Sequence, residues 1–92
     1  MSTHIRFSRK FVKKYDRLPQ KVQQAVDSRI NLFEQSPSHP LLRNHALVGR
    51  LNDYRSINIT GDYRAVFKTI TRSKTETTFL FILIGTHSEL YG

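Results

Sequence analysis

Hydrophobic and polar positions alternate near the N-terminus and then change to a helical period. Residues 4–7 alternate as in a short strand, and Ser8 is a suitable N-terminal cap for a helix that follows it. In the next turns the apolar side chains recur at the spacing of one helix face, at Phe11, Tyr15 and Leu18. The pattern therefore predicts a strand followed directly by a short amphipathic helix.

A second helix is predicted over residues 19–35. Pro19 suits its first turn, because a fixed φ and a missing N–H cost nothing at a helix start. The apolar stripe of this helix consists of Val22, Ala25, Val26, Ile30 and Phe33. Pro37 and Pro40 cannot continue a helix, so the chain turns there. The two helices are expected to form an antiparallel hairpin with one shared apolar face.

Two adjoining strands are predicted after an irregular connection over residues 41–52. Residues 53–60 and residues 63–70 both alternate between apolar and polar side chains. The Gly-Asp pair at 61–62 favours a tight turn between them. This part of the chain therefore predicts a β-hairpin.

A last strand is predicted over residues 77–84, before a polar tail at 85–92. The strand is apolar on both faces, which indicates a central strand buried on both sides. The order strand, helix, helix, strand, strand, strand predicts an α+β fold. We expect one curved sheet, its last three strands antiparallel, with the helical hairpin on one face. A chain of this length suits a single domain over residues 1–92.

The positive charge is concentrated in the first half of the chain and indicates an anionic partner. Fifteen Lys and Arg against seven Asp and Glu give a net charge of +8. Residues 1–50 carry ten basic and three acidic side chains, a net of +7, and residues 51–92 carry five and four, a net of +1. Such a field suits nucleic acid, a lipid surface or an acidic protein segment, although solubility alone also explains it. The polar face of the first helix is a candidate docking surface for RNA, with Lys10, Lys13, Lys14 and Arg17.

Several function classes are excluded. The chain has no cysteine, so it can form neither a disulfide framework nor a thiolate metal site. It has no apolar run long enough for a membrane span and no signal-peptide pattern, so a cytoplasmic protein is expected. It contains no P-loop, no dinucleotide-binding glycine motif and no zinc-protease or serine-hydrolase motif.

Side chains suited to acid–base chemistry collect near the ends of the predicted strands. His45 lies in the connection, Asp62 in the hairpin turn and His87 just after the last strand. Histidine titrates near neutral pH, so two of them beside a basic cleft can serve as general base and general acid. A single histidine in a loop is more often solvated or bonded to the backbone.

Other candidate residues lie close to these positions. The planar fork of Arg64 can bind phosphate, or it can form a surface ion pair. Tyr63 and Tyr91 can stack on a base, a contact worth about 1–3 kcal/mol, or pack at the edge of the core. Because side chains alternate along a strand, Tyr63 and Arg64 should point to opposite faces of the sheet.

Four motifs together resemble those of the RelE/ParE superfamily of bacterial toxins, and within it the YafQ-like branch. They are HALVG at 45–49, YRS at 54–56, GDYRAVF at 61–67 and GTHSELY at 85–91, the last being the most specific. The resemblance covers nearly the whole chain. It implies the toxin of a type II toxin–antitoxin system, which binds the 70S ribosome and cuts mRNA in the A site. A cognate antitoxin neutralises such a toxin, and no homo-oligomer is expected without it.

The resemblance also implies chemistry without a metal or another cofactor. A base takes the proton of a ribose 2′-hydroxyl, the oxygen attacks the adjacent phosphate, and an acid protonates the departing 5′-oxygen. By position, His87 is expected to be the acid, His45 or Asp62 the base, and Arg64 the support of the phosphate. Tyr91 matches an aromatic residue near the substrate.

Three positions differ from the YafQ-like pattern. Tyr63 stands where the branch often has tryptophan, Asn58 replaces a histidine, and Leu83 replaces an arginine. An amide cannot exchange a proton at neutral pH, and leucine offers a phosphate no donor. Losing one positioned donor can cost about 10²–10³ in rate.

Three functions therefore stay open. The first is an mRNA endonuclease, with activity reduced by the residues at 58 and 83, and it predicts that His87→Ala abolishes toxicity. The second is a ParE-like toxin that acts on DNA gyrase without cutting RNA. The third is a catalytically weakened member that only binds an antitoxin or RNA.

Overall fold

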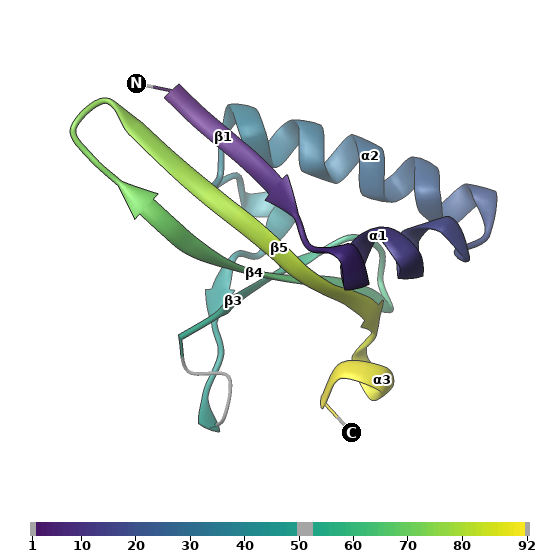
Figure 1. Cartoon of the computed structure of the whole chain (residues 1–92). Helices are drawn as coiled ribbons and strands as arrows, with labels where there is room; N and C mark the ends of the chain where they lie inside the picture. The colour runs from purple at the N-terminus through teal and green to yellow at the C-terminus, as the bar shows by residue number, and fades with distance from the viewer. Residues whose placement is uncertain (1, 50–52, 92) are drawn as a thin grey trace.

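The structure, a computed structural model, describes residues 2–49 and 53–91. Its elements are β1 (Ser2–Phe7), α1 (Arg9–Asp16), α2 (Gln20–Gln35), the 3₁₀ helix η1 (Pro40–Leu42), β2 (His45–Ala46), β3 (Arg55–Asn58), β4 (Tyr63–Arg72), β5 (Glu76–Thr86) and α3 (His87–Tyr91). In Figure 1 the long strands β4 and β5 run through the molecule beside α1 and α2, and α3 follows the end of β5. The α+β class expected from the sequence is confirmed.

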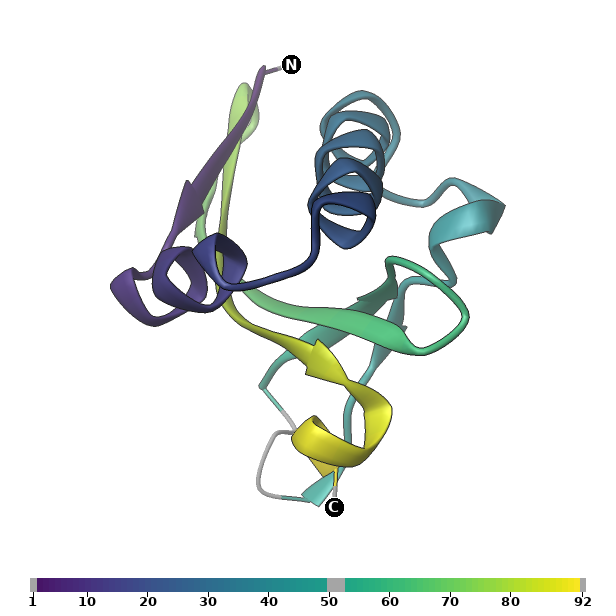
Figure 2. The same ribbon diagram turned by 90° about the vertical axis from the view of Figure 1, so that its right-hand side faces the viewer.

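The sheet is mixed, with the order β1-β5-β4-β3-β2. Strand β1 is parallel to β5, and the other neighbours are antiparallel. Strand β5 lies inside the sheet, between β1 and β4, but the prediction that it is buried on both faces is wrong. Phe81 is buried, whereas Leu80 and Ile82 keep intermediate exposure. The reason is that α1 and α2 lie on the same side of the sheet (Figure 2).

The predicted helix boundaries are confirmed at both ends of the helical hairpin. The Ser8 hydroxyl accepts a hydrogen bond from the Phe11 N–H at 3.1 Å and donates one to the carbonyl of Ile82 at 3.0 Å. Ser8 therefore caps α1 and ties it to β5. Pro19 precedes α2 as its cap residue, and α2 ends before Pro37. No helix within residues 2–49 and 53–91 is long and apolar enough to cross a membrane.

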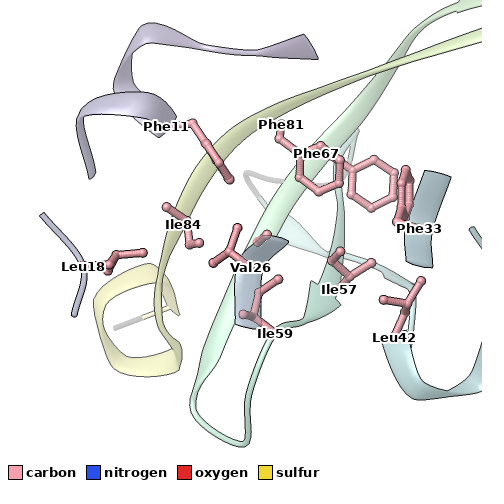
Figure 3. Packing of buried hydrophobic residues seen from close by; sticks show 11 residues of the cluster. Phe11, Leu18, Val26, Phe33, Leu42, Ile57, Ile59, Phe67, Phe81 and Ile84 are labelled. Carbon is pink, nitrogen blue, oxygen red and sulfur yellow. The ribbon is translucent and has the colours of Figure 1, made fainter. Parts of the chain in front are cut away.

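The core fills the space between the helices and one face of the sheet. Phe33 of α2 is completely buried and packs edge-on against Phe67, Phe79 and Phe81, with ring centroids 4.9, 4.9 and 5.2 Å away. Figure 3 shows Val26 of α2 in the same cluster, near Ile84 of β5. Since the helices occupy this face, the opposite face of the sheet is left for a site.

Three local predictions need correction. The connection over residues 41–52, of which 50–52 lie outside the described residues, contains part of η1 and the short strand β2 rather than only irregular chain. The turn between β3 and β4 spans residues 59–62, because Thr60 accepts hydrogen bonds from the N–H groups of Asp62 and Tyr63. The polar tail continues β5 and then forms α3.

Candidate active site

An open cavity of about 730 Å³ lies on the sheet face that α1 and α2 leave uncovered. Strand register explains why its polar side chains meet there. Asn58, Arg64 and Gly85 are direct neighbours across β3, β4 and β5. The cavity is lined by Asn58 and Arg64 from these strands, by His45 from β2 and by His87 from α3, together with Arg43 and Tyr91.

His45 is held in one orientation by a backbone hydrogen bond. Its Nδ1 lies 2.7 Å from the carbonyl oxygen of Arg43. A carbonyl only accepts, so Nδ1 carries the hydrogen, and in the neutral ring Nε2 keeps a lone pair. Arg43 has a left-handed backbone conformation, with φ of 47°, which is uncommon outside glycine. This bend at the end of η1 presents a histidine that can accept a proton.

Helix α3 starts with a reciprocal capping box. The Glu89 carboxylate accepts a hydrogen bond from the Thr86 N–H at 2.8 Å, and the Thr86 hydroxyl accepts one from the Glu89 N–H at 3.2 Å. A Cβ added at Gly85 would lie 3.0 Å from a Glu89 carboxylate oxygen, so a larger residue at 85 would require this carboxylate to shift. The Thr-x-x-Glu spacing is the signal in the sequence that identifies this helix start.

Further hydrogen bonds fix α3 over the cavity. The His87 N–H donates to the carbonyl of Asp62 at 3.0 Å. The Tyr91 hydroxyl donates to the Ser56 hydroxyl at 2.9 Å, and Ser56 is completely buried. The rings of His87 and Tyr91 meet edge-on, with centroids 4.9 Å apart. The two ends of this short helix are therefore anchored to β3 and to the β3–β4 turn.

An ion pair joins α3 to α1. Lys14 Nζ lies 2.9 Å from Glu89 Oε2. The Lys14 ammonium, and next the Thr86 N–H, lower the pKa of Glu89 from its ordinary value of 4.5 to about 2. One lysine of the basic helix face is thus engaged in holding α3.

We expect the anchoring of α3 to depend on pH through Glu89. Because the pKa is lower in the folded state, the charged carboxylate stabilises the helix above about pH 4.5, and this contribution is lost as the pH falls toward about 2. Both groups are partly exposed, so salt should weaken the effect. The protection factor of the Thr86 amide, which is its hydrogen exchange relative to the intrinsic rate at each pH, measures this contribution from pH 6 to pH 2. Glu89→Gln should remove this dependence, whereas Glu76→Gln should keep it. An unchanged profile in Glu89→Gln would contradict the assignment.

The side chain of Arg64 is held by backbone carbonyl groups of residues 60, 61 and 63, in and next to the β3–β4 turn. Its Nη1 donates to the carbonyl oxygens of Thr60, Gly61 and Tyr63 at 3.0, 3.1 and 3.1 Å. The N–H groups on Nε and Nη2 are not used in these bonds, so a guanidinium of fixed position faces the cavity. Such a fork suits a phosphate oxygen.

The structure brings together only some of the predicted site residues. His45, Arg64, His87 and Tyr91 line one cavity, and Asn58 lies among them. Asp62 does not line it, and contributes its backbone carbonyl instead of its carboxylate. Asp62 is therefore poorly placed to be the base.

Two further predicted positions lie away from the cavity. Tyr63 packs against the core on the helix side, so its opposition to Arg64 is confirmed and a stacking role in the cavity is not supported. Leu83 lines a separate space of about 270 Å³ with Lys10 and Lys14. The apolar residue at 83 thus lines a space between α1 and α3 and does not line the cavity of the two histidines.

Comparison with known proteins shows that the fold is similar to that of several bacterial toxins of solved structure. No protein-family model matches the sequence, and no curated protein matches it. Among solved structures, YafQ from Escherichia coli is similar at a TM-score of 0.74 and 22% identity, covering 99% of this chain and 100% of that one. A YoeB/ParE toxin from Agrobacterium tumefaciens matches at 0.75 and 20% identity, covering 91% and 98%. The RelBE2 toxin–antitoxin complex from Mycobacterium tuberculosis matches at 0.73 and 17% identity, covering 95% and 100%.

Proposed function

Starting from the RelE/YafQ-like fold of the chain, we propose that the protein is the toxin of a type II toxin–antitoxin system and cuts mRNA on the 70S ribosome. The observation that carries the proposal is the convergence of His45, Arg64 and His87 on one open cavity. These residues come from three separate elements, and the cavity is on the sheet face that the two long helices leave free.

The geometry suits cleavage by the neighbouring 2′-hydroxyl of the RNA. His45 Nε2 takes the proton of that hydroxyl, because its Nδ1–H is held by Arg43. The oxygen attacks the phosphorus, the bond to the 5′-oxygen breaks, and protonated His87 gives its proton to the 5′-oxygen. The products are a 2′,3′-cyclic phosphate and a free 5′-hydroxyl. Arg64 stabilises the charge that develops on the phosphate oxygens.

The departures at 58 and 83 are compatible with this chemistry. Asn58 lines the cavity and can donate a hydrogen bond to the ribose or to a phosphate oxygen, while the two histidines carry the proton transfers. Leu83 does not line the cavity. Arg43 and Arg64 therefore supply the positive charge beside the reacting phosphate.

The partners follow from the charge and from the similar structures. The net charge of +8 favours docking on the phosphates of the ribosome, and the binding should weaken steeply with salt. The RelBE2 structure is a toxin–antitoxin complex. We infer that a cognate antitoxin also neutralises this chain, in the bacterial cytoplasm, by covering its basic surface or its cavity.

The test is induced expression in a bacterium, followed by primer extension on a reporter mRNA. We expect growth arrest and cuts that follow the reading frame, that require translation, and that vanish in His87→Ala. Arrest with intact mRNA and altered DNA supercoiling would indicate gyrase as the target instead. Soluble folded protein that causes no arrest would indicate a member that only binds.

A further inference from the structure

A second cavity, of about 480 Å³, lies beside the loop that follows α2. Arg43, Arg55 and Arg72 all line it, and all three side chains are exposed. None of its lining residues within the described chain is acidic. The core residue Phe67 and the partly buried Phe79 also line the cavity. Such a concentration of unneutralised guanidinium groups in one hollow is suited to an anion.

Arg55 is held in place without losing its charge. Its Nε donates to the side-chain oxygen of Asn44 at 2.7 Å, and its Nη2 donates to the Asn44 carbonyl at 3.4 Å. The Asn44 amide in turn donates to the carbonyl of Pro37 at 3.0 Å. A carboxylate in this place would neutralise the guanidinium, whereas the neutral amide fixes its position only. The cation is therefore preorganised for an external partner.

Arg43 connects the two cavities. It lines the cavity of His45, Arg64 and His87 as well as the cavity of Arg55 and Arg72. Its carbonyl also orients His45. A polyanion whose phosphate lies beside the two histidines would meet Arg43 next and could continue around the edge of the sheet that ends in β2.

We propose that the cavity of Arg43, Arg55 and Arg72 binds a backbone phosphate of the RNA strand whose neighbouring phosphate lies in the candidate active site. The inference rests on the proposed function. Glutamate-rich protein segments also pair with arginine, but the continuity through Arg43 with a site for a reacting phosphate favours an RNA strand.

The test measures binding of RNA that cannot be cut. Fluorescence anisotropy is recorded with labelled 2′-O-methyl RNA, as a dinucleotide and as a strand of about ten nucleotides. The cavity variants are Arg55→Gln and Arg72→Gln. The control is Arg6→Gln, which removes the same charge from an exposed position on β1, at the opposite edge of the sheet. Thermal unfolding of each variant checks that the fold is kept.

We expect each cavity variant to weaken binding of the longer strand about tenfold at low salt, as for the loss of a charged hydrogen bond. Each should also reduce the slope of log K against log salt by about 0.7, the value for one phosphate contact of a single strand. Binding of the dinucleotide should not change. Arg6→Gln should leave the salt slope unchanged for both RNAs.

Three results would overturn the subsite. The first is an equal loss of RNA affinity in Arg6→Gln and Arg72→Gln. The second is an equal loss of affinity for the short and the long strand in the cavity variants. The third is that a glutamate-rich peptide, but not RNA, binds in a way that depends on Arg55 and Arg72. Because the probe cannot be cut, this test is independent of catalysis. If the protein makes in-frame cuts but the cavity variants bind short and long RNA equally, the proposed nuclease activity stands and the proposed subsite is wrong. If the cavity variants weaken only the longer RNA but no cuts are made, the subsite stands and the nuclease activity is wrong.

Discussion

Replacing His45 or His87 with alanine is expected to slow cleavage of ribosome-bound mRNA by about 10²–10⁴-fold, the range of a lost general acid or base. Both imidazoles line the cavity, and the Nε2 of His45 is left as an acceptor by the bond to Arg43. Single-turnover cleavage with the protein in excess over the ribosome-bound mRNA measures the chemical step. Removing both histidines should cost far less than the product of the single effects, because the two transfers belong to one reaction.

Two controls separate proton transfer from positioning. His4→Ala should cleave at the normal rate, because His4 is exposed on β1, does not line the cavity, and its Nε2 lies 3.3 Å from a Glu76 carboxylate oxygen. His45→Gln keeps a donor for the Arg43 carbonyl but cannot accept a proton at neutral pH. It should be as slow as His45→Ala. Normal cleavage by His45→Gln would mean that His45 shapes the cavity and is not the base.

The largest effect on stability is expected for Phe33→Ala, which should lower the free energy of unfolding by about 3–5 kcal/mol. Phe33 has no exposed surface and contacts the rings of Phe67, Phe79 and Phe81. Domains of this kind are stable by only about 5–15 kcal/mol, so the variant should be close to unfolding. Urea denaturation followed by circular dichroism measures the change.

The matched control for Phe33 is Phe7→Ala. Phe7 also contacts two rings, those of Phe11 and Phe81, with centroids 5.1 and 6.1 Å away, but it is 42% exposed. Its loss removes less buried surface and leaves a space that water can enter, so the cost should be clearly smaller. Equal costs for the two variants would show that the helix–sheet core is not centred on Phe33.

Local periodicity predicts the elements better than it predicts the site. The alternation of residues 63–70 and the stripe of α2 follow from side-chain direction, so they can be read in the sequence. The two-residue strand β2 shows no alternation, yet it carries His45 into the cavity. Its position depends on pairing with β3, where His45 lies opposite Ser56, and no alternation in residues 45–46 predicts that pairing. The convergence of His45 and His87 was expected from the family resemblance and not from their spacing.

Some side chains took roles that residue type alone does not reveal. Asp62 is a candidate base by chemistry, but the turn directs its carbonyl to His87 and leaves its carboxylate outside the cavity. Glu89 was not singled out, although the Thr-x-x-Glu spacing is visible in the sequence. The orientation of Arg43 depends on its left-handed backbone conformation, and no local sequence pattern predicts that conformation.

The position of β5 between β1 and β4 determines when the fold can form during synthesis. Strand β1 is made first, but its partner in the sheet is β5, the last strand in the order along the chain. A nascent chain that stops before Glu76 has nothing to join β1 to β4, and it also lacks His87. Pairing of such distant segments is slow, because a long loop must close before the contacts form. A nascent chain therefore has neither the complete sheet nor the residues of the candidate active site until β5 and α3 have left the ribosome.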